Sequence, residues 1–496
     1  MDLLLIFSVL PMSLRLYNSL TREKTPFQPL QDGMVTMYCC GITVYDYCHL
    51  GHARTCITWD LVRRYLQWSG YAVRYVQNFT DIDDKILNRA VQEGSTMEAI
   101  AERFIEAYFE DMERLGVQPA DLYPRATHTL DGIKRLIAEL EAKGFAYPAD
   151  GDVYYAVRNF ARYGKLSGRK LDDLQVGASG RVAIADPETS IKRDPLDFAL
   201  WKGAKPGEPA WDSVWGSGRP GWHIECSAMV REFLGETIDL HVGGNDLLFP
   251  HHENEIAQSE AATGKPLAQY WLHNGMVKVG GEKMSKSLGN FTTIRELLET
   301  VDPMAIRLLV LQGHYRKPLD FTETAIAAAT NGWQTLADGL QLGYQYGEQL
   351  SWEQDPQTLS PEANSWTQAF QTAVDDDFNF AGGLAILFEL AKTLRAEANR
   401  LRYEGKIQGD PHLLQGQWIT LVSLASILGL SVIGETEEKT ETTGALGDGE
   451  IEDLVNQRNL ARKNKDFAEG DRLRDLLQAQ GITLVDKAGG VTEWFR

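Results

Sequence analysis

The sequence predicts an α/β protein in which a parallel, Rossmann-like sheet is followed by a helical bundle and a small terminal unit. A buried strand, a helix and a second strand follow one another in residues 35–78, which is the order of a βαβ unit. The strand pattern resumes at 237–243 after a long interruption. From residue 323 onward, Ala, Leu and Gln recur at helical spacing. A chain of 496 residues is also too long for one hydrophobic core, so we expect several domains.

The first half of the predicted sheet lies in residues 12–144. The run VTMYCCGI at 35–42 is almost wholly apolar, which predicts a buried strand that stops at Gly41. Apolar residues then recur four positions apart from Ile57 onward, which indicates a helix. Residues 71–78 alternate like the second strand of the unit.

The rest of the chain divides where its composition changes. Many Gly, Pro and Asp residues follow position 145 and predict an irregular insertion between the two halves of the sheet. A polar, acidic stretch without apolar periodicity predicts a linker before the terminal unit. The expected units are the connecting insertion at 145–215, the second half of the sheet at 216–322, the bundle at 323–433, the linker at 434–450 and a C-terminal domain at 451–496.

The first eleven residues, MDLLLIFSVLP, are apolar but lack the basic start of a signal peptide and are too short to span a bilayer. We interpret Met12 as the start of the protein and residues 1–11 as an upstream extension; the alternative is a short buried strand. No other stretch reaches transmembrane length, so we expect no membrane association. Five cysteines without regular spacing are no disulfide framework and fit a reducing, cytoplasmic location.

The formal net charge of −20 argues against a nucleic-acid partner, because an acidic surface repels a polyanion. A local basic face can still bind a phosphate backbone. Such a face is predicted on a helical stretch after the linker, where cations outnumber Asp466, Glu469 and Asp471. These cations are Arg458, Arg462, Lys463, Lys465, Arg472 and Arg474.

The motif HLGH places His49 and His52 directly after the first predicted strand, at the start of a helix. Residues three apart share a helix face, and a helix N-terminus favours anions, so the two imidazoles form a candidate phosphate site. For these four letters alone, a pair of ordinary surface histidines is the better interpretation. The strand–loop–helix context favours the phosphate site.

A second motif, KMSKS, contributes Lys283 and Lys286 within the loop GGEKMSKSLGN. Two lysines among small residues, with glycines on both sides, predict a mobile cationic loop that closes over a triphosphate. The alternative is a solvated surface loop, but its placement after HLGH and across a second strand-rich half favours the phosphate role.

Together, HLGH and KMSKS resemble the two signatures of class I aminoacyl-tRNA synthetases. The segments MYCCGITVYDYCHLGHART, NFTDIDDK, GWHIECSAM and GGNDLLFPHHENEIAQSE are similar to the cysteinyl-tRNA synthetases in particular. This resemblance covers the chain from about residue 13 to its end. It implies a Rossmann-like class I catalytic domain with an insertion, a helical bundle and a small C-terminal anticodon-binding domain.

The resemblance also implies an activity and its partners. The expected reaction activates L-cysteine with ATP and Mg²⁺ to cysteinyl-adenylate and loads the cysteine onto tRNA(Cys), in an enzyme that we expect to be a monomer. By the same resemblance, HLGH and KMSKS bind ATP, Asp246 binds its ribose, and Thr80 and Trp222 line the cysteine pocket. Trp222 could equally be a core aromatic.

A candidate metal centre combines Cys40, Cys226, His251 and Glu255. Spacing alone does not predict it, because there is no CxxC pair and only His251 and Glu255 share a helix face; buried cysteines beside a polar helix start explain the pattern as well. The resemblance implies that these four residues hold one zinc ion, for which their donor atoms are suited. Cys39 should point to the opposite side of the strand.

Two other functions remain as alternatives. A cysteine ligase acting on an amino-sugar thiol precursor would share the catalytic half and the zinc set, but it would lack the C-terminal unit that this chain keeps. A catalytically inactive, synthetase-like RNA-binding protein should have lost HLGH, KMSKS or a candidate zinc ligand, and all of these are intact.

Overall fold

The structure is a computed structural model that describes most of the chain. The described residues are 14–173, 191–279, 282–283, 292–352, 364–432, 448–463, 466–479, 482–486 and 492–495. The N-terminal extension at 1–11 therefore lies outside the described residues. Among the described residues, no helix combines the length and the apolar character needed to cross a membrane.

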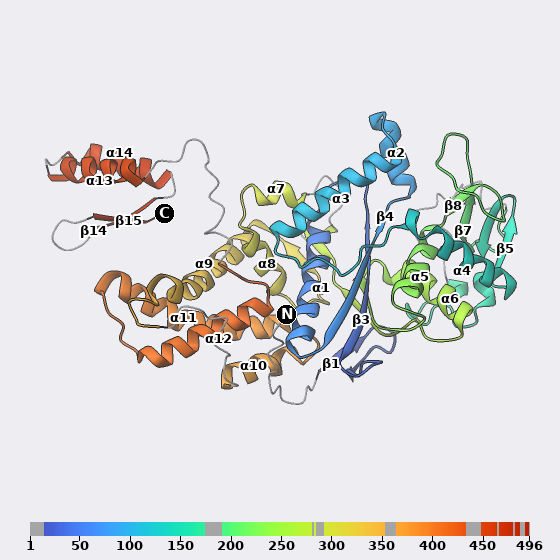
Figure 1. Ribbon diagram of the computed structural model, residues 1–496, viewed down its shortest axis with the longest axis horizontal. Coiled ribbons are helices and arrows are strands. Elements are labelled where there is room, and N and C mark those ends of the chain that lie inside the picture. The colour runs from blue at the N-terminus through green and yellow to red at the C-terminus, as the bar shows by residue number, and fades with distance from the viewer. Residues whose placement is uncertain are drawn as a thin grey trace.

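A central parallel sheet of four strands, in the order β10-β9-β3-β4, confirms the predicted α/β class (Figure 1). Helix α1 (Leu50–Trp68) connects β3 to β4, and α6 (Glu253–Thr263) connects β9 to β10, so each half is a βαβ unit. The strands are β3 (Met34–Thr43), β4 (Ala72–Thr80), β9 (Ile238–Gly244) and β10 (Ala268–Asn274).

Strand β3 separates two hydrophobic cores. Met37 and Cys39 pack into the core that α1 shares with the helical bundle, whereas Tyr38 and Cys40 belong to the core on the other face. Cys39 thus points away from Cys40, as the alternation of a strand predicts. Cys48 and Cys56 are buried in the same core as Cys39, so the structure gives these three cysteines packing positions.

The prediction that the first strand stops at Gly41 was wrong. Strand β3 continues to Thr43, with a shift of register against β4 between Cys39 and Ile42. A Cβ atom at Gly41 would lie 1.7 Å from the carbonyl oxygen of Asn78, so the glycine permits close approach of the two backbones and does not end the strand.

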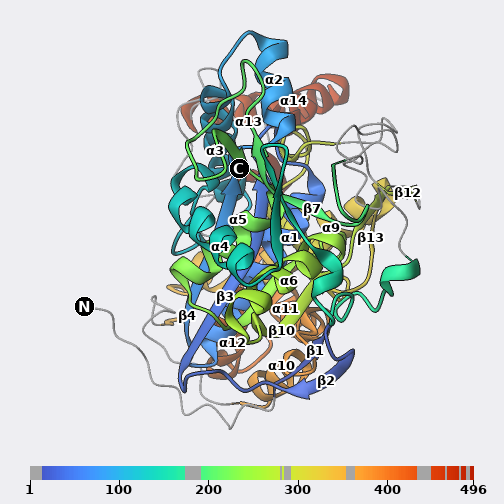
Figure 2. The same ribbon diagram turned by 90° about the vertical axis from the view of Figure 1, so that its right-hand side faces the viewer.

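The segment after residue 145 does lie between the two halves of the central sheet, as predicted, but the prediction that it is irregular was wrong. The described residues of this segment form a four-stranded antiparallel sheet in the order β5-β6-β7-β8. It lies beside helices α4 and α5 (Figure 1), at the end of the molecule that Figure 2 turns toward the viewer. Strands this short, separated by Gly, Pro and Asp turns, leave little alternation to detect. The elements are α4 (Leu130–Ala142), β5 (Ala146–Ala149), β6 (Asp152–Tyr155), β7 (Phe198–Gly203), β8 (Gly218–Pro220) and α5 (Trp222–Phe233).

Two more helices follow β4, and a bundle packs on the face of the central sheet that carries α1 (Figure 1). The buried Arg307 links the bundle to helix α1, because it donates to the Leu428 carbonyl at 2.7 Å and pairs with Asp60 of α1. The helices are α2 (Asp84–Glu93), α3 (Met97–Arg114), α7 (Ile294–Leu298), α8 (Pro303–Leu311), α9 (Glu323–Tyr346), α10 (Ser365–Val374), α11 (Phe380–Glu404) and α12 (Pro411–Ile427).

The C-terminal unit has a small hydrophobic cluster of its own, formed by Ile451, Val455, Leu477 and Ile482. Its first helix begins at Asp448, so the predicted linker at 434–450 extends three residues too far; positions 433–447 lie outside the described residues. The elements are α13 (Asp448–Lys463), α14 (Phe467–Ala479) and the antiparallel pair β14 (Thr483–Asp486) and β15 (Thr492–Phe495).

Candidate active site

The site lies where the carboxyl ends of the parallel strands meet the starts of three helices, as is general for open α/β sheets. Cys40 lies near the end of β3, and Thr80 is the last residue of β4. Cys226 lies in the first turns of α5, while His251 and Glu255 flank the start of α6. Segments far apart in the sequence therefore converge at one place.

The structure brings the four predicted metal ligands together. One donor atom each from Cys40, Cys226, His251 and Glu255 lies within 4.8 Å of all the others, and all four residues are buried. The Cys40 thiol donates to Glu255 Oε1 at 3.1 Å, and His251 Nε2 lies 3.0 Å from the same oxygen. Two sulfurs, one imidazole nitrogen and one carboxylate oxygen suit zinc.

The electrostatics of this cluster favour the charged form of three donors, whereas burial raises the pKa of the Cys40 thiol well above its ordinary value. A hydrogen bond from Cys40, which outweighs burial, lowers the pKa of the Cys226 thiol to about 6. Burial would lower the pKa of His251, but the Glu255 carboxylate and Cys226 raise it to about 9. Burial would likewise raise the pKa of Glu255, yet His241 and His251 hold it well below its usual range. A thiolate and a carboxylate thus face one another across a cationic imidazole, an arrangement in which a divalent cation can replace protons.

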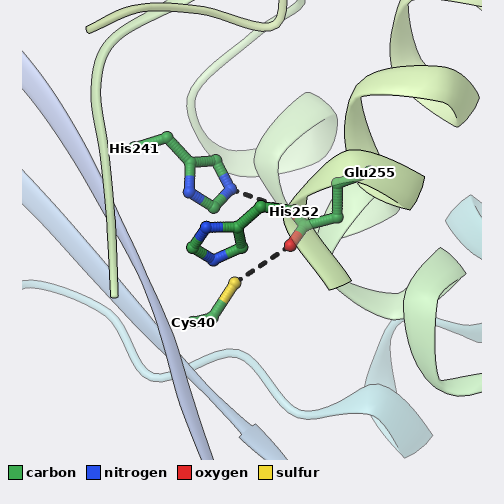
Figure 3. A group of neighbouring side chains, drawn as sticks. All are labelled: Cys40, His241, His252 and Glu255. Atoms are coloured by element: carbon green, nitrogen blue, oxygen red, sulfur yellow. Dashed lines mark hydrogen bonds and ion pairs between the residues drawn. The ribbon is translucent and has the colours of Figure 1, made fainter. Parts of the chain in front are cut away.

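A second group of possible ligands overlaps the first and comprises Cys40, His241, His252 and Glu255. Figure 3 shows the two imidazoles beside the Cys40 sulfur and the Glu255 carboxylate. His241 Nε2 lies 2.9 Å from Glu255 Oε2, and His252 Nδ1 lies 2.9 Å from His273 Nε2. This group offers only one sulfur, so the set with both cysteines is the better zinc site, and His241 supports its carboxylate from behind.

Trp222 and His223 hold the His251 ring. The indole of Trp222 stacks on the imidazole with centroids 4.1 Å apart, and His223 Nδ1 lies 3.0 Å from His251 Nδ1. Trp222 is thus part of the site wall and not a remote core aromatic. Thr80 lies nearby, where its hydroxyl donates to Glu225 Oε2 at 2.9 Å.

His49 and His52 form a stacked pair at the start of α1, with ring centroids 3.7 Å apart and planes inclined by 13°. His49 is the N-cap residue: its Nδ1 accepts from the backbone N–H groups of Gly51 and His52. His52 Nδ1 accepts in turn from the His49 N–H at 3.3 Å. Because both Nδ1 atoms are acceptors, each neutral ring carries its proton on Nε2 and can donate to a phosphate.

Burial keeps both rings neutral. It lowers the pKa of His49 to about 4, against a smaller opposing effect of the Asp246 carboxylate, and it lowers the pKa of His52 well below its ordinary value. Asp246 is an exposed carboxylate just after β9, and its charge is among those that act on His49.

Of the two KMSKS lysines, Lys286 lies outside the described residues. Lys283 ends the short strand β12 (Glu282–Lys283), and its side chain is outside the description too. A backbone bridge between His49 and Thr293 brings the segment that follows this loop next to the HLGH motif.

The predicted basic face of the C-terminal unit needs one correction. Arg458 is buried and donates to Asn459 and Thr492, so it supports the fold and is not part of a surface. Lys465 lies outside the described residues. The exposed cations are Arg462, Lys463, Arg472 and Arg474, of which Arg472 is paired with Glu469 at 2.7 Å.

Sequence reasoning missed Glu225 and the histidines around the ligand set: His223, His241, His252 and His273. One signal was present in the sequence. His241, like Asp239, is a polar residue in a buried parallel strand, where a polar side chain needs a functional or structural partner. The contacts of the other residues depend on helix packing that no local pattern reveals.

Comparison with known proteins agrees with this geometry. Residues 26–331 match the family described as tRNA synthetases class I (C) catalytic domain, and residues 369–432 match the DALR domain family. The cysteine–tRNA ligase of Synechocystis sp. is 78% identical over 485 residues, which are 98% of this chain and 100% of the relative. That of Gloeothece citriformis is 69% identical with the same coverage.

Solved structures share the fold at low identity. The methionyl-tRNA synthetase of Mycobacterium tuberculosis in complex with methionyl-adenylate is 16% identical, with a TM-score of 0.53 over 80% of this chain and 89% of its own. The LeuRS of Agrobacterium radiobacter is 13% identical, with a TM-score of 0.56 over 81% and 84%. Since the catalytic family match spans more than half of the sequence and the relatives match along their whole length, the chain belongs to the cysteine–tRNA ligase family of class I tRNA synthetases.

Proposed function

We propose that the protein is a cysteine–tRNA ligase, which activates L-cysteine with ATP to cysteinyl-adenylate and transfers the cysteinyl group to the 3′ end of tRNA(Cys). The observation that carries this function is the convergence of Cys40 and Cys226 with His251 and Glu255 in a buried cluster at the strand ends. No side-chain nucleophile is required, because positioning and charge stabilisation suffice for both steps.

The donor set fits one zinc ion per chain, held by Cys40, Cys226, His251 and Glu255. When bound, zinc supplies a Lewis acid that accepts the thiolate of cysteine as a ligand far better than the hydroxyl of serine. Such selection matters, because cysteine and serine are very similar in size and shape. A simple pocket discriminates between two such similar substrates by only about 10–200-fold. The chain's own contribution is to orient the donors: His241 engages the second oxygen of Glu255, and His223 engages the far nitrogen of His251.

For ATP, the protonated Nε2 atoms of His49 and His52 would donate to phosphate oxygens, and Asp246 would accept from the ribose. Lys283 and Lys286 would neutralise the charge that develops on the departing pyrophosphate, together with Mg²⁺. The exposed cations of the C-terminal unit would hold the anticodon arm of the tRNA. We expect a monomer that works in the cytoplasm.

The test is a pair of assays on the purified protein. Cysteine-dependent ATP–pyrophosphate exchange, followed by charging of purified tRNA(Cys), would support the proposal. Activation of cysteine with transfer to an amino-sugar thiol precursor, and none to tRNA, would favour the small-molecule ligase. RNA binding without any exchange activity would favour an inactive synthetase-like protein.

A further inference from the structure

The Glu225 carboxyl group is buried and incompletely satisfied. It lies on α5 next to Cys226, and its exposed fraction is 0%. Oε2 accepts the hydrogen bond from the Thr80 hydroxyl at 2.9 Å, whereas Oε1 is buried and, among the described residues, has no hydrogen-bond partner. Burying an unpaired polar oxygen is unfavourable, so an atom in this state indicates a ligand that completes its interactions.

The charges around Glu225 indicate what kind of ligand this is. In the described part of the chain, no lysine, arginine or histidine forms an ion pair with it. Burial above all, and then the nearby Cys226, Asp81 and Asp83, raise the pKa of the Glu225 carboxyl well above its ordinary value, so a cation beside it would favour the ionised form. Asp81 and Asp83 are buried as well, at 5% and 8% exposure. Asp81 already accepts hydrogen bonds from Thr127 and Asp83 caps α2, so the unpaired Glu225 Oε1 is the place where a cation would be complementary.

The Thr80 hydroxyl points to the same ligand. Its proton is donated to Glu225, so its oxygen can only accept a hydrogen bond from a second group. An uncharged acceptor and a carboxylate oxygen therefore stand side by side, next to Cys226 of the candidate metal centre. In cysteine, the ammonium group and the thiol are carried by neighbouring carbon atoms, so one small ligand offers both a sulfur and a cation.

We propose that Glu225 recognises the α-ammonium group of the cysteine substrate, with the Thr80 hydroxyl, oriented by Glu225, as the second acceptor. This assignment rests on the proposed function. It divides recognition of the amino acid into two parts: the cluster around Cys40 and Cys226 selects the sulfur, and Glu225 selects the ammonium group.

The substitution Glu225→Gln tests the assignment, because it keeps the size of the side chain and removes its charge. We compare two ligands, cysteine and 3-mercaptopropionate, which has the thiol and the carboxylate but no ammonium group. The KM for cysteine in pyrophosphate exchange should rise roughly tenfold to a hundredfold, as for loss of a charge-assisted hydrogen bond. The inhibition constant of 3-mercaptopropionate and the KM for ATP should not change.

Glu232→Gln is the matched control, because it removes the same charge from an exposed position on the same helix and should alter none of these constants. Zinc content and thermal unfolding are measured for every variant. If Glu225→Gln does not fold, Thr80→Val replaces it and should weaken cysteine binding alone.

Two results would overturn the proposal. Equal weakening of cysteine and 3-mercaptopropionate would make Glu225 a structural residue, and unchanged cysteine binding would deny it any role. A wild-type protein without cysteine-dependent exchange would instead refute the proposed function, so the two failures are distinguishable.

Discussion

Trp222 lies against the imidazole of His251, with ring centroids 4.1 Å apart and planes inclined by 28°. His251 is fixed on two other sides, by His223 at Nδ1 and by Glu255 at Nε2. The indole therefore covers one face of the ring of a candidate metal ligand. We expect it to hold that ligand in one orientation and to exclude water from that face.

Replacing Trp222 should weaken cysteine binding in proportion to the loss of this stack. Trp222→Ala should raise the KM for cysteine about tenfold, near the upper end of the energy of an aromatic pair. Trp222→Phe keeps a ring over His251 and should have a much smaller effect. Pyrophosphate exchange at saturating ATP measures both. Equal KM values for cysteine in the Trp222→Ala and Trp222→Phe variants would show that the stack on His251 does not contribute to cysteine binding.

The metal centre can be tested by composition and by spectroscopy. The wild-type protein should contain one zinc per chain, and Cys226→Ser should contain clearly less, because a thiolate donor is lost. In a cobalt-substituted protein, cysteine should strengthen the sulfur-to-metal charge-transfer band and serine should leave it unchanged. Tight cysteine binding without a spectral change would mean that the metal is structural.

The HLGH histidines predict a dependence of stability on pH. The pKa of His49 is lowered to about 4 in the folded state, so only the unfolded chain takes up this proton between pH 6.5 and 4. Folding stability must therefore fall as the pH drops through that window, by up to about 1.4 kcal/mol per pH unit for this residue.

The substitution His49→Asn isolates this contribution. Asparagine is a good N-cap residue, so α1 keeps its capped start while the titrating group is removed. Urea unfolding near pH 7 and near pH 5.5 should show a smaller loss of stability for the variant than for the wild type. The same loss in both proteins would contradict a half-buried His49 that stays neutral in the folded state.

The parts of the fold that the sequence predicted are those with strong periodicity. The helix that begins at Glu323 and the strand of residues 237–243 were predicted to within one residue, because their apolar positions repeat over the whole element. The sheet at β5-β6-β7-β8 was missed, because its strands have three to six residues and its pairing is set by contacts between them.

The residues of the candidate site also differ in how far the sequence alone could predict them. Cys40, Cys226, His251 and Glu255 could be named only through resemblance to a family, since their spacing carries no local signal. Glu225 could not be named at all, and His241 only as a polar residue in a buried strand, because what distinguishes each is a contact across the fold: Thr80 Oγ1 for Glu225, and Glu255 Oε2 for His241. Long-range contacts of buried polar groups are decided by packing and not by local pattern.

Lys286 should act on the activation step. Lys286→Ala should lower the rate of cysteinyl-adenylate formation by roughly two orders of magnitude, with little effect on the KM for cysteine, because the lost cation stabilises the departing pyrophosphate. Lys278→Ala removes a lysine from the exposed position of β11 (Val277–Val279), just before the loop, and is the control. Near-normal turnover of the Lys286 variant would refute the phosphate role.

The C-terminal unit should serve tRNA charging and not amino-acid activation. Its apolar residues form a cluster of their own, so deleting residues 448–496 should leave the two cores of the catalytic half and the bundle intact. Pyrophosphate exchange should stay within about twofold of the full chain, whereas kcat/KM for tRNA should fall by two orders of magnitude or more, to roughly the level expected when most phosphate contacts are lost.

A double variant separates the effect of the basic face from the effect of deleting the whole unit. Arg462→Glu, Lys463→Glu in the full chain reverses two exposed cations at the end of α13 and should weaken tRNA binding while flattening its dependence on salt. Substitution of the exposed Glu404 at the end of α11 by Gln is the control and should change neither.

If exchange and charging fell together in a well-folded truncated protein, the C-terminal unit would be needed for the chemistry itself. If only the deletion and not the charge reversal impaired charging, the unit would act through its shape and not through its basic face.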